Sequence, residues 1–285
     1  MLWLCSGSVE VFPQVIRAEE GYYKRCDLTS VERLERFWRN FVLTFPPWAT
    51  EMDGPVVICY PEVPIYPANH AADIDVSEDE AENMLKKVNE YFLLRGSSYT
   101  CFRISPLTRP KSFTFLLENH GFKRKSEESV MVFKGKRLED KLKPDIKVKE
   151  TSKSEMNVYN KLMFTIFEMP IEWKKGWDKL IPIWIKKGMK SYLAYVERKP
   201  VGIASLFSSM KTGCIFNLGT LKEYRKRGIG TTLTAKTVMD SIKEGNSIHT
   251  LQAEKGGNAE RLYKEIGFEI DHTISFYVKS FHDKN

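Results

Sequence analysis

The chain has 285 residues, of which 42% are hydrophobic and 28% are charged, and its formal net charge is +7. That length suits two domains of ordinary size, and the composition is typical of a globular protein. No apolar run is long enough to span a bilayer, and residues 1–10 lack the basic and hydrophobic regions of a secretion signal. These features exclude a membrane-embedded protein, and we expect a soluble, cytoplasmic one.

The cysteines and the basic residues narrow the class further. The sequence has no C-x-x-C pair and no histidine cluster, so it predicts reduced thiols and no metal site. The positive charge attracts phosphate groups, but Lys and Arg are scattered in pairs and no RNA-binding signature accompanies them. An anionic small ligand or an acidic partner explains the charge equally well, so nucleic acid is not the expected partner. The cysteines are Cys5, Cys26, Cys59, Cys101 and Cys214.

The first half of the chain contains a run of helix, strand, helix and strand. Ser77 and Glu80 form a capping box that opens the first helix, and Gly96 ends it. The pair Gly121-Phe122 ends the second helix. The predicted elements are a helix over 78–95, a strand over 99–104, a helix over 111–119 and a strand over 129–133.

A charged stretch that contains proline, residues 134–149, follows these elements. Such a composition between two structured segments is typical of an interdomain linker. We place the boundary near Asp145, which gives one domain over residues 1–145 and another over 146–285.

The second half repeats the order of the first after an antiparallel meander. Its last helix is one that Asn258 can cap and that Gly267-Phe268 ends, as Gly121-Phe122 does in the first half. This repeat predicts a duplicated fold of the α/β (α+β) class, in which each half has a mixed, mostly antiparallel sheet flanked by helices. The predicted helices are 154–167, 175–187, 231–243 and 258–266, and the strands are 191–196, 201–207, 214–219, 249–253 and 273–278.

The stretch from residue 218 to residue 231 is the candidate binding site. It lies where a strand ends and a helix begins, and its glycines let successive backbone N–H groups point outward. Free amides, the positive end of a helix dipole and two arginines together favour a pyrophosphate. The candidate ligand-binding residues are Leu218, Gly219, Thr220, Arg225, Lys226, Arg227, Gly228, Ile229, Gly230 and Thr231.

Two motifs in the second half resemble the GNAT superfamily of acyl-CoA N-acyltransferases. Residues 225–230 match its Q/R-x-x-G-x-G/A pyrophosphate loop, and residues 259–268 match its A-x-x-L-Y-x-x-x-G-F signature. The motifs stand in the order and spacing of the family, and the resemblance covers roughly residues 150–281. The resemblance implies an N-acetyltransferase that uses acetyl-CoA as donor and a primary amine as acceptor, by direct attack and without a metal.

The resemblance also implies roles for individual residues. Residues 218–220 are expected to bind the pantetheine arm and polarise the thioester carbonyl, and Tyr263 is expected to give its proton to the departing sulfur. Asn258 is expected to face the cofactor. The general base stays open between Glu168, Asn217 and a water chain from solvent.

Carrying the repeat onto the first half predicts that this half is degenerate. Leu117 stands where Tyr263 stands in the second half, so the proton donor is missing. Residues 73–80 are acidic and lack glycine, which repels a pyrophosphate. We expect the first half to shape an acceptor cleft or to bind a partner. A chain that binds acyl-CoA without transferring its acyl group, as a sensor or scaffold, is the alternative function.

Aromatic residues gather in the segment between the linker and the meander. Most are expected in the core, and one or two are expected to line the acceptor pocket. They are Phe164, Phe167, Trp173, Trp177 and Trp184.

Overall fold

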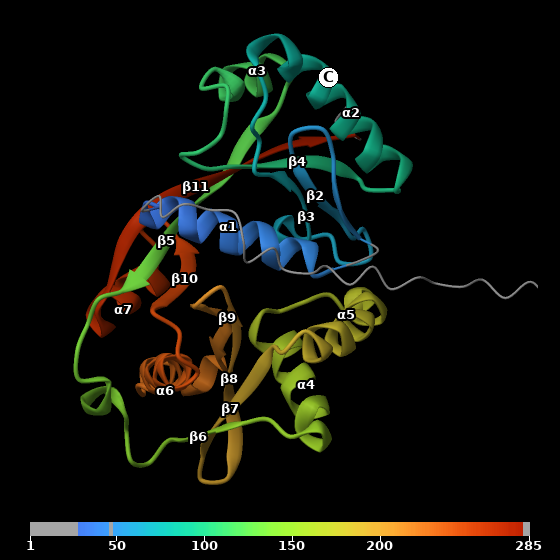
Figure 1. The fold of residues 1–285 in the computed structure, drawn as a ribbon. Helices are drawn as coiled ribbons and strands as arrows, with labels where there is room; N and C mark the ends of the chain where they lie inside the picture. The colour runs from blue at the N-terminus through green and yellow to red at the C-terminus, as the bar shows by residue number, and fades with distance from the viewer. Residues whose placement is uncertain (1–27, 46–47, 282–285) are drawn as a thin grey trace, which may run out of the picture.

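The computed structural model describes residues 28–45 and 48–281 as one continuous sheet with helices packed on it (Figure 1). The sheet has 11 strands in the order β1-β2-β3-β4-β11-β5-β10-β9-β8-β7-β6. The strands are β1 (Ala49–Glu51), β2 (Val56–Cys59), β3 (Asn69–Ala72), β4 (Tyr99–Ile104), β5 (Lys123–Phe133), β6 (Lys147–Glu150), β7 (Lys190–Val196), β8 (Lys199–Ser209), β9 (Thr212–Thr220), β10 (Ile248–Glu254) and β11 (Phe268–Ser280).

The helices confirm the expected order in both halves. The amide of Ser77 donates to the Glu80 carboxylate at 3.1 Å, as the capping box requires. Gly267 has a φ of +118°, in the left-handed region that glycine tolerates, and it ends the last helix. The helices are α1 (Ser30–Leu43), α2 (Glu78–Leu94), α3 (Phe113–Asn119), α4 (Met156–Ile166), α5 (Lys174–Lys186), α6 (Ile229–Lys243) and α7 (Asn258–Ile266).

One predicted helix cap is wrong. Asn258 was expected to cap α7, but it is the first helical residue and Gly257, with an extended ψ of 172°, is the N-cap. The Asn258 side chain accepts a hydrogen bond from Arg261 Nη2 at 2.7 Å instead. Helix α6 is two residues longer at its start than predicted, because it begins at Ile229 where Thr231 was expected.

The predicted linker contains structure of its own. The short helix η2 (Leu138–Lys141) is followed by β6, which pairs with β7 at the edge of the sheet. The amide of Lys143 donates to Thr232 Oγ1 on α6 at 3.3 Å. The linker therefore packs against the helix that opens after the glycine-rich loop.

The last strands of the two halves are exchanged. Strand β11, from the end of the chain, lies between β4 and β5, while β5, from the first half, pairs with both β11 and β10. β5 is longer than the predicted strand because its early residues pair with β11, as in the pair Lys123↔Val278. Each half of the sheet therefore contains a strand from the other half of the chain, and the boundary near Asp145 stays a prediction.

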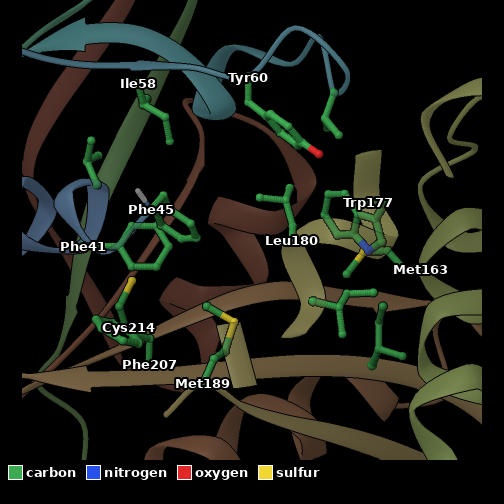
Figure 2. Close-up of a cluster of buried hydrophobic side chains, with 14 of the residues drawn as sticks. Phe41, Phe45, Ile58, Tyr60, Met163, Trp177, Leu180, Met189, Phe207 and Cys214 are labelled. Carbon is green, nitrogen blue, oxygen red and sulfur yellow. The ribbon is translucent and has the colours of Figure 1, made fainter. Parts of the chain in front are cut away.

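The largest hydrophobic cluster joins the two halves (Figure 2). Phe41 of α1, Phe45 just after that helix and Ile58 of β2 come from the first half, and they meet Trp177 and Leu180 of α5 from the second. Figure 1 shows α4 and α5 on one side of β7–β9 and α6 on the other. Neighbouring residues of β8 pack on opposite faces of the sheet. Leu206 packs toward α6, and Phe207 packs in the cluster between the halves.

A buried ion pair joins α1 to the exchanged strand. Arg103 of β4 donates to both carboxylate oxygens of Glu35 at 2.5 and 2.9 Å, and His272 Nε2 of β11 lies 3.0 Å from Glu35 Oε1. Burial alone would raise the pKa of Glu35, but the Arg103 charge and the hydrogen bonds from Arg103 and His272 hold it at about 2. A carboxylate so placed stabilises the position of β11 against the first half.

The cysteines of the described chain are all buried and free, namely Cys59, Cys101 and Cys214. Cys5 and Cys26 lie outside the described residues. None of the helices in the described ranges has the length and apolar character needed to cross a membrane.

Candidate functional site

Strands β9 and β10 separate at the centre of the second half. They run parallel and pair from Ile248↔Thr212 to Leu251↔Ile215, where their pairing ends. The remainder of β9, residues 216–220, pairs with β8 on one edge. The other edge of that segment has no strand beside it in the described structure, so its backbone groups are available to a ligand.

An irregular turn of the backbone lies where the strands part. The β8–β9 register shifts between the pairs Ser205↔Phe216 and Ile203↔Gly219, so two β9 residues oppose Ala204 alone. Asn217, one of these two, has a φ of +52°. Such a bulge re-aims neighbouring side chains and backbone groups, and it is frequent next to active sites. Of the three predicted pantetheine-binding residues, Leu218 is the other residue of the bulge, and Gly219 and Thr220 follow it directly.

The glycine-rich loop leads into the N-terminus of α6. Gly228 is the N-cap with a φ of +85°, and the first backbone bond of the helix runs from Thr232 N–H to the Gly228 carbonyl at 2.9 Å. The amides of Ile229, Gly230 and Thr231 therefore have no partner within the helix. Unpaired amides at the positive end of a helix dipole form an anion site.

Exposed cationic side chains surround these amides. Arg225, Lys226 and Arg227 are all exposed at the loop. Arg225 Nε donates to the Thr220 carbonyl at 3.3 Å, and the Arg227 guanidinium lies 5.1 Å from the Tyr224 ring centre. The structure thus brings together every residue that the sequence proposed for the pyrophosphate loop.

Lys143 is a further cation that the sequence reading missed. A β-carbon built on Gly228 would lie 2.6 Å from Lys143 Cε and 3.2 Å from its Nζ. The lysine comes from the linker and lies over the loop because the linker packs on α6. Its position in the sequence, about 80 residues before the loop, carried no signal of this contact.

Tyr263 lies in the core between α6, α7 and the sheet. Its side chain is 6% exposed, and its ring centre lies 5.9 Å from that of Phe268. Burial raises the pKa of Tyr263 to about 12, so the phenol keeps its proton at neutral pH. No side chain or backbone group in the described part of the chain accepts a hydrogen bond from its hydroxyl. A protonated donor without a partner suits the role of an acid.

Two candidates lie less favourably than the loop. Asn258 is exposed at the start of α7, and Arg261 already occupies its carbonyl oxygen. Glu168 is exposed beyond the end of α4 with a φ of +49°. The position of each is compatible with a surface role, and their predicted functions stay predictions.

A cavity of about 110 Å³ lies between the two halves, on the face of the sheet opposite α6. It reaches the β9 bulge, since Phe216 and Asn217 line it. Of the five aromatic residues expected near an acceptor pocket, Trp177 and Trp184 line this cavity. The first half supplies much of the remaining wall, including Trp38, Phe41, Phe45, Trp48 and Tyr60. No local pattern in the sequence predicts that these residues meet, because long-range packing brings them together.

In the described ranges, no three His, Cys, Asp or Glu side chains lie close enough together to hold a metal ion. The arrangement does offer unpaired helix amides beside cationic side chains, an open strand edge, a protonated phenol and a mostly apolar cavity.

Comparison with known proteins agrees with this arrangement. Residues 187–270 match the family model described as an acetyltransferase (GNAT) domain. The matched range includes the meander, the loop, α6, β10 and α7. No curated protein matches the sequence.

Solved structures share the fold over most of the chain. A GCN5-related N-acetyltransferase from Kribbella flavida is 14% identical with a TM-score of 0.67, covering 88% of this chain and 96% of that one. A functionally unknown protein from Staphylococcus epidermidis is 18% identical with a TM-score of 0.63, covering 81% and 92%. A tandem GNAT protein from the clavulanic acid biosynthesis pathway is 10% identical with a TM-score of 0.59, covering 85% and 86%. Residues 187–270 are therefore similar to a GNAT acetyltransferase domain, and the fold of the chain is similar to that of a tandem GNAT protein.

Proposed function

We propose that this protein is an N-acetyltransferase that moves the acetyl group of acetyl-CoA to a primary amine at a single site in its C-terminal half. One observation carries the proposal: the glycine-rich loop, its helix N-terminus and the free edge of β9 converge at the gap between β9 and β10. The loop and the helix N-terminus suit a pyrophosphate, and the free edge of β9 suits a pantetheine amide chain and its thioester.

The loop would hold the pyrophosphate of the coenzyme. Amides 229–231 offer N–H donors, and Arg225, Arg227 and Lys143 offer positive charge around them. Hydrogen bonds to a charged group contribute roughly twice the stabilisation of neutral ones. The pantetheine arm would then extend along residues 218–220 as an added strand.

The transfer needs no covalent enzyme intermediate. The amine nitrogen attacks the thioester carbonyl and forms the new C–N bond, and the C–S bond breaks. Tyr263 donates its phenolic proton to the departing thiolate, and the attacking nitrogen loses a proton to water or to a base at the cavity. Protonation by a positioned acid contributes about 10²- to 10⁴-fold in rate.

A binding protein without turnover is the second candidate function. It is favoured because neither predicted candidate is a clear general base. Glu168 is exposed, and the Asn217 side chain is not a base. Turnover of acetyl-CoA in the presence of an amine separates the two candidates.

Calorimetric titration with acetyl-CoA tests the site itself. Wild type should show saturable binding, and Gly228→Asp should lose about 100-fold in affinity because it adds a negative charge and a side chain at a residue with positive φ. Asp79→Asn, in the corresponding region of the first half, is the matched control and should bind as wild type. Saturable binding that survives Gly228→Asp would refute the assigned loop.

A further inference from the structure

We infer that the cavity between the two halves holds the apolar part of the acceptor, and that the acceptor is a primary amine whose carbon skeleton carries a single ring. This inference deepens the proposed function and rests on it. It concerns the described residues that surround the cavity, and none of the coenzyme contacts.

The size of the cavity matches one ring. Its volume of about 110 Å³ is of the order of the ~150 Å³ apolar cavity that binds benzene in another protein. Half of the lining residues are aromatic, and Phe41 and Phe216 stack with ring centres 4.7 Å apart. Cavities lined by aromatic rings bind flat apolar groups through contact area and ring geometry.

The cavity wall is apolar, and none of its described lining residues is charged. A cationic amine would find no carboxylate there. Burial disfavours the charged ammonium form and lowers the pKa of an amine, so a bound amine would be neutral and nucleophilic. An apolar cavity of this kind would therefore supply part of what a general base would otherwise supply.

Two indole rings of the cavity wall pack edge to face. Trp177 and Trp184 both line the cavity, and their ring centres lie 5.0 Å apart at an interplanar angle of 88°. An aromatic ring on the acceptor would extend this edge-to-face packing, whereas an alkyl chain would not.

The cavity and the coenzyme loop lie on opposite faces of one strand. On β9, Cys214 packs with the cluster between the halves and Ile215 packs with α6. The cavity meets that strand at Phe216 and Asn217, where β9 leaves β10. An amine anchored by its ring in the cavity would therefore reach the gap from the side opposite the pyrophosphate loop. Asn217 offers a carboxamide oxygen there to accept a hydrogen bond from the amine.

The same cavity could instead take the acyl chain of the donor, and the experiment separates the two. Initial rates are measured for the full chain with acetyl-CoA and either 2-phenylethylamine or ethylamine, and with ethylamine and either acetyl-CoA or hexanoyl-CoA. We expect kcat/KM for 2-phenylethylamine to exceed that for ethylamine by about 10- to 100-fold, the value of burying one ring. The ratio of kcat/KM for hexanoyl-CoA to kcat/KM for acetyl-CoA should stay below about 10-fold.

Variants that fill the cavity provide the decisive comparison. Ala68→Leu adds a side chain to a half-buried lining residue, and it should reduce the preference for the ring-bearing amine to below about 5-fold. Ile65→Phe, at a second lining residue, should do the same if Ala68→Leu fails to fold. Ala49→Leu makes the same change at a half-buried residue that does not line the cavity, and the preference should persist.

A binding measurement keeps this inference separate from the proposed function. Four tryptophans line the cavity, so 2-phenylethylamine should change the intrinsic fluorescence saturably without any acyl donor, and Ala68→Leu should abolish the change. Equal kcat/KM values for the two amines, no saturable fluorescence change, or a filling variant that impairs only hexanoyl-CoA would each overturn the inference. Absence of acetyl-CoA binding would instead refute the proposed function.

Discussion

The loops before α2 and before α6 occupy matching places in the two halves, yet they carry opposite charges. The loop before α6 has Arg225, Lys226 and Arg227, with Lys143 beside it. The loop before α2 has Asp73 and Asp75, and Arg39 from α1 already pairs with Asp73 at 2.5 Å. The two halves therefore share an architecture, but only the loop before α6 is basic, and we expect the anion site in that half alone.

The difference extends beyond the loops. Leu117 of α3 is fully buried at the place of Tyr263, so the first half has an apolar contact where the second has a proton donor. The first half also contributes α1 and β2 to the cavity wall and β5 to the sheet of the second half. We therefore expect the first half to act as a scaffold and as a wall of the cavity, and we expect the second half not to fold without it.

The largest expected effect is the loss of folding when the halves are separated. A chain of residues 146–285 lacks β5, which leaves β10 with an unpaired edge and exposes the apolar cluster of α4 and α5. We expect it to be aggregated or unfolded by circular dichroism and size-exclusion chromatography.

Coexpression of residues 1–145 provides the control for that prediction. If the exchange of β5 and β11 holds the fold together, the two fragments should assemble into a soluble complex that melts cooperatively. A soluble, cooperatively melting fragment 146–285 on its own would contradict the importance of the exchange.

A buried charge gives the next effect. Arg103→Met leaves the Glu35 carboxylate buried without its main partner, which should lower the free energy of unfolding by about 3–5 kcal/mol in urea denaturation. The double variant Glu35→Leu/Arg103→Met removes both charges and should recover most of that loss. A single variant as stable as wild type would show that the ion pair does not position β11.

The same pair predicts a pH dependence of stability. The pKa of Glu35 is lowered in the fold to about 2, so its contribution is fully present above the ordinary carboxyl pKa near 4.5 and is lost as the pH falls toward 2. Unfolding monitored between pH 5 and pH 2 should show this loss in wild type. In the Glu35→Leu/Arg103→Met variant it should be smaller.

Tyr263→Phe should reduce kcat by about 100-fold while acetyl-CoA affinity stays unchanged, because the variant removes a proton donor and keeps the ring. The raised pKa of Tyr263, about 12, keeps the acid protonated, so activity should not fall through its titration below about pH 11. Tyr277→Phe, in the core of the first half, is the control. A loss of affinity with unchanged kcat would assign Tyr263 to binding and not to catalysis.

The smallest effect concerns Lys143. Lys143→Ala should weaken acetyl-CoA binding by about 3- to 10-fold, the value of one exposed charge near a phosphate, and the loss should shrink as salt is raised. Lys147→Ala, another exposed linker lysine, should have less effect. Equal losses for both would show a general effect of charge.

The sequence was sufficient for the parts of the fold that depend on local signals. The capping box at Ser77 and the helix stop at Gly267 are properties of a few neighbouring residues, and both were predicted. Asn258 shows the limit of such signals, since a good capping residue lies one position inside the helix because Gly257 takes the extended conformation before it.

The parts that depend on distant contacts could not be predicted. Strand β11 reads as the last strand of its own half, and only the pairing with β4 and β5 reveals the exchange. The aromatic wall of the cavity is built from α1, β2, α5 and β9, which no pattern along the chain connects. Lys143 reaches Gly228 only because the linker docks on α6.

The stoichiometry of acetyl-CoA binding tests the central claim most directly. Calorimetric titration of the full chain should give one molecule of acetyl-CoA bound per chain, and the single site should be lost in Gly228→Asp. Two molecules per chain, or one that persists in Gly228→Asp and disappears when the acidic loop before α2 is altered, would contradict the account.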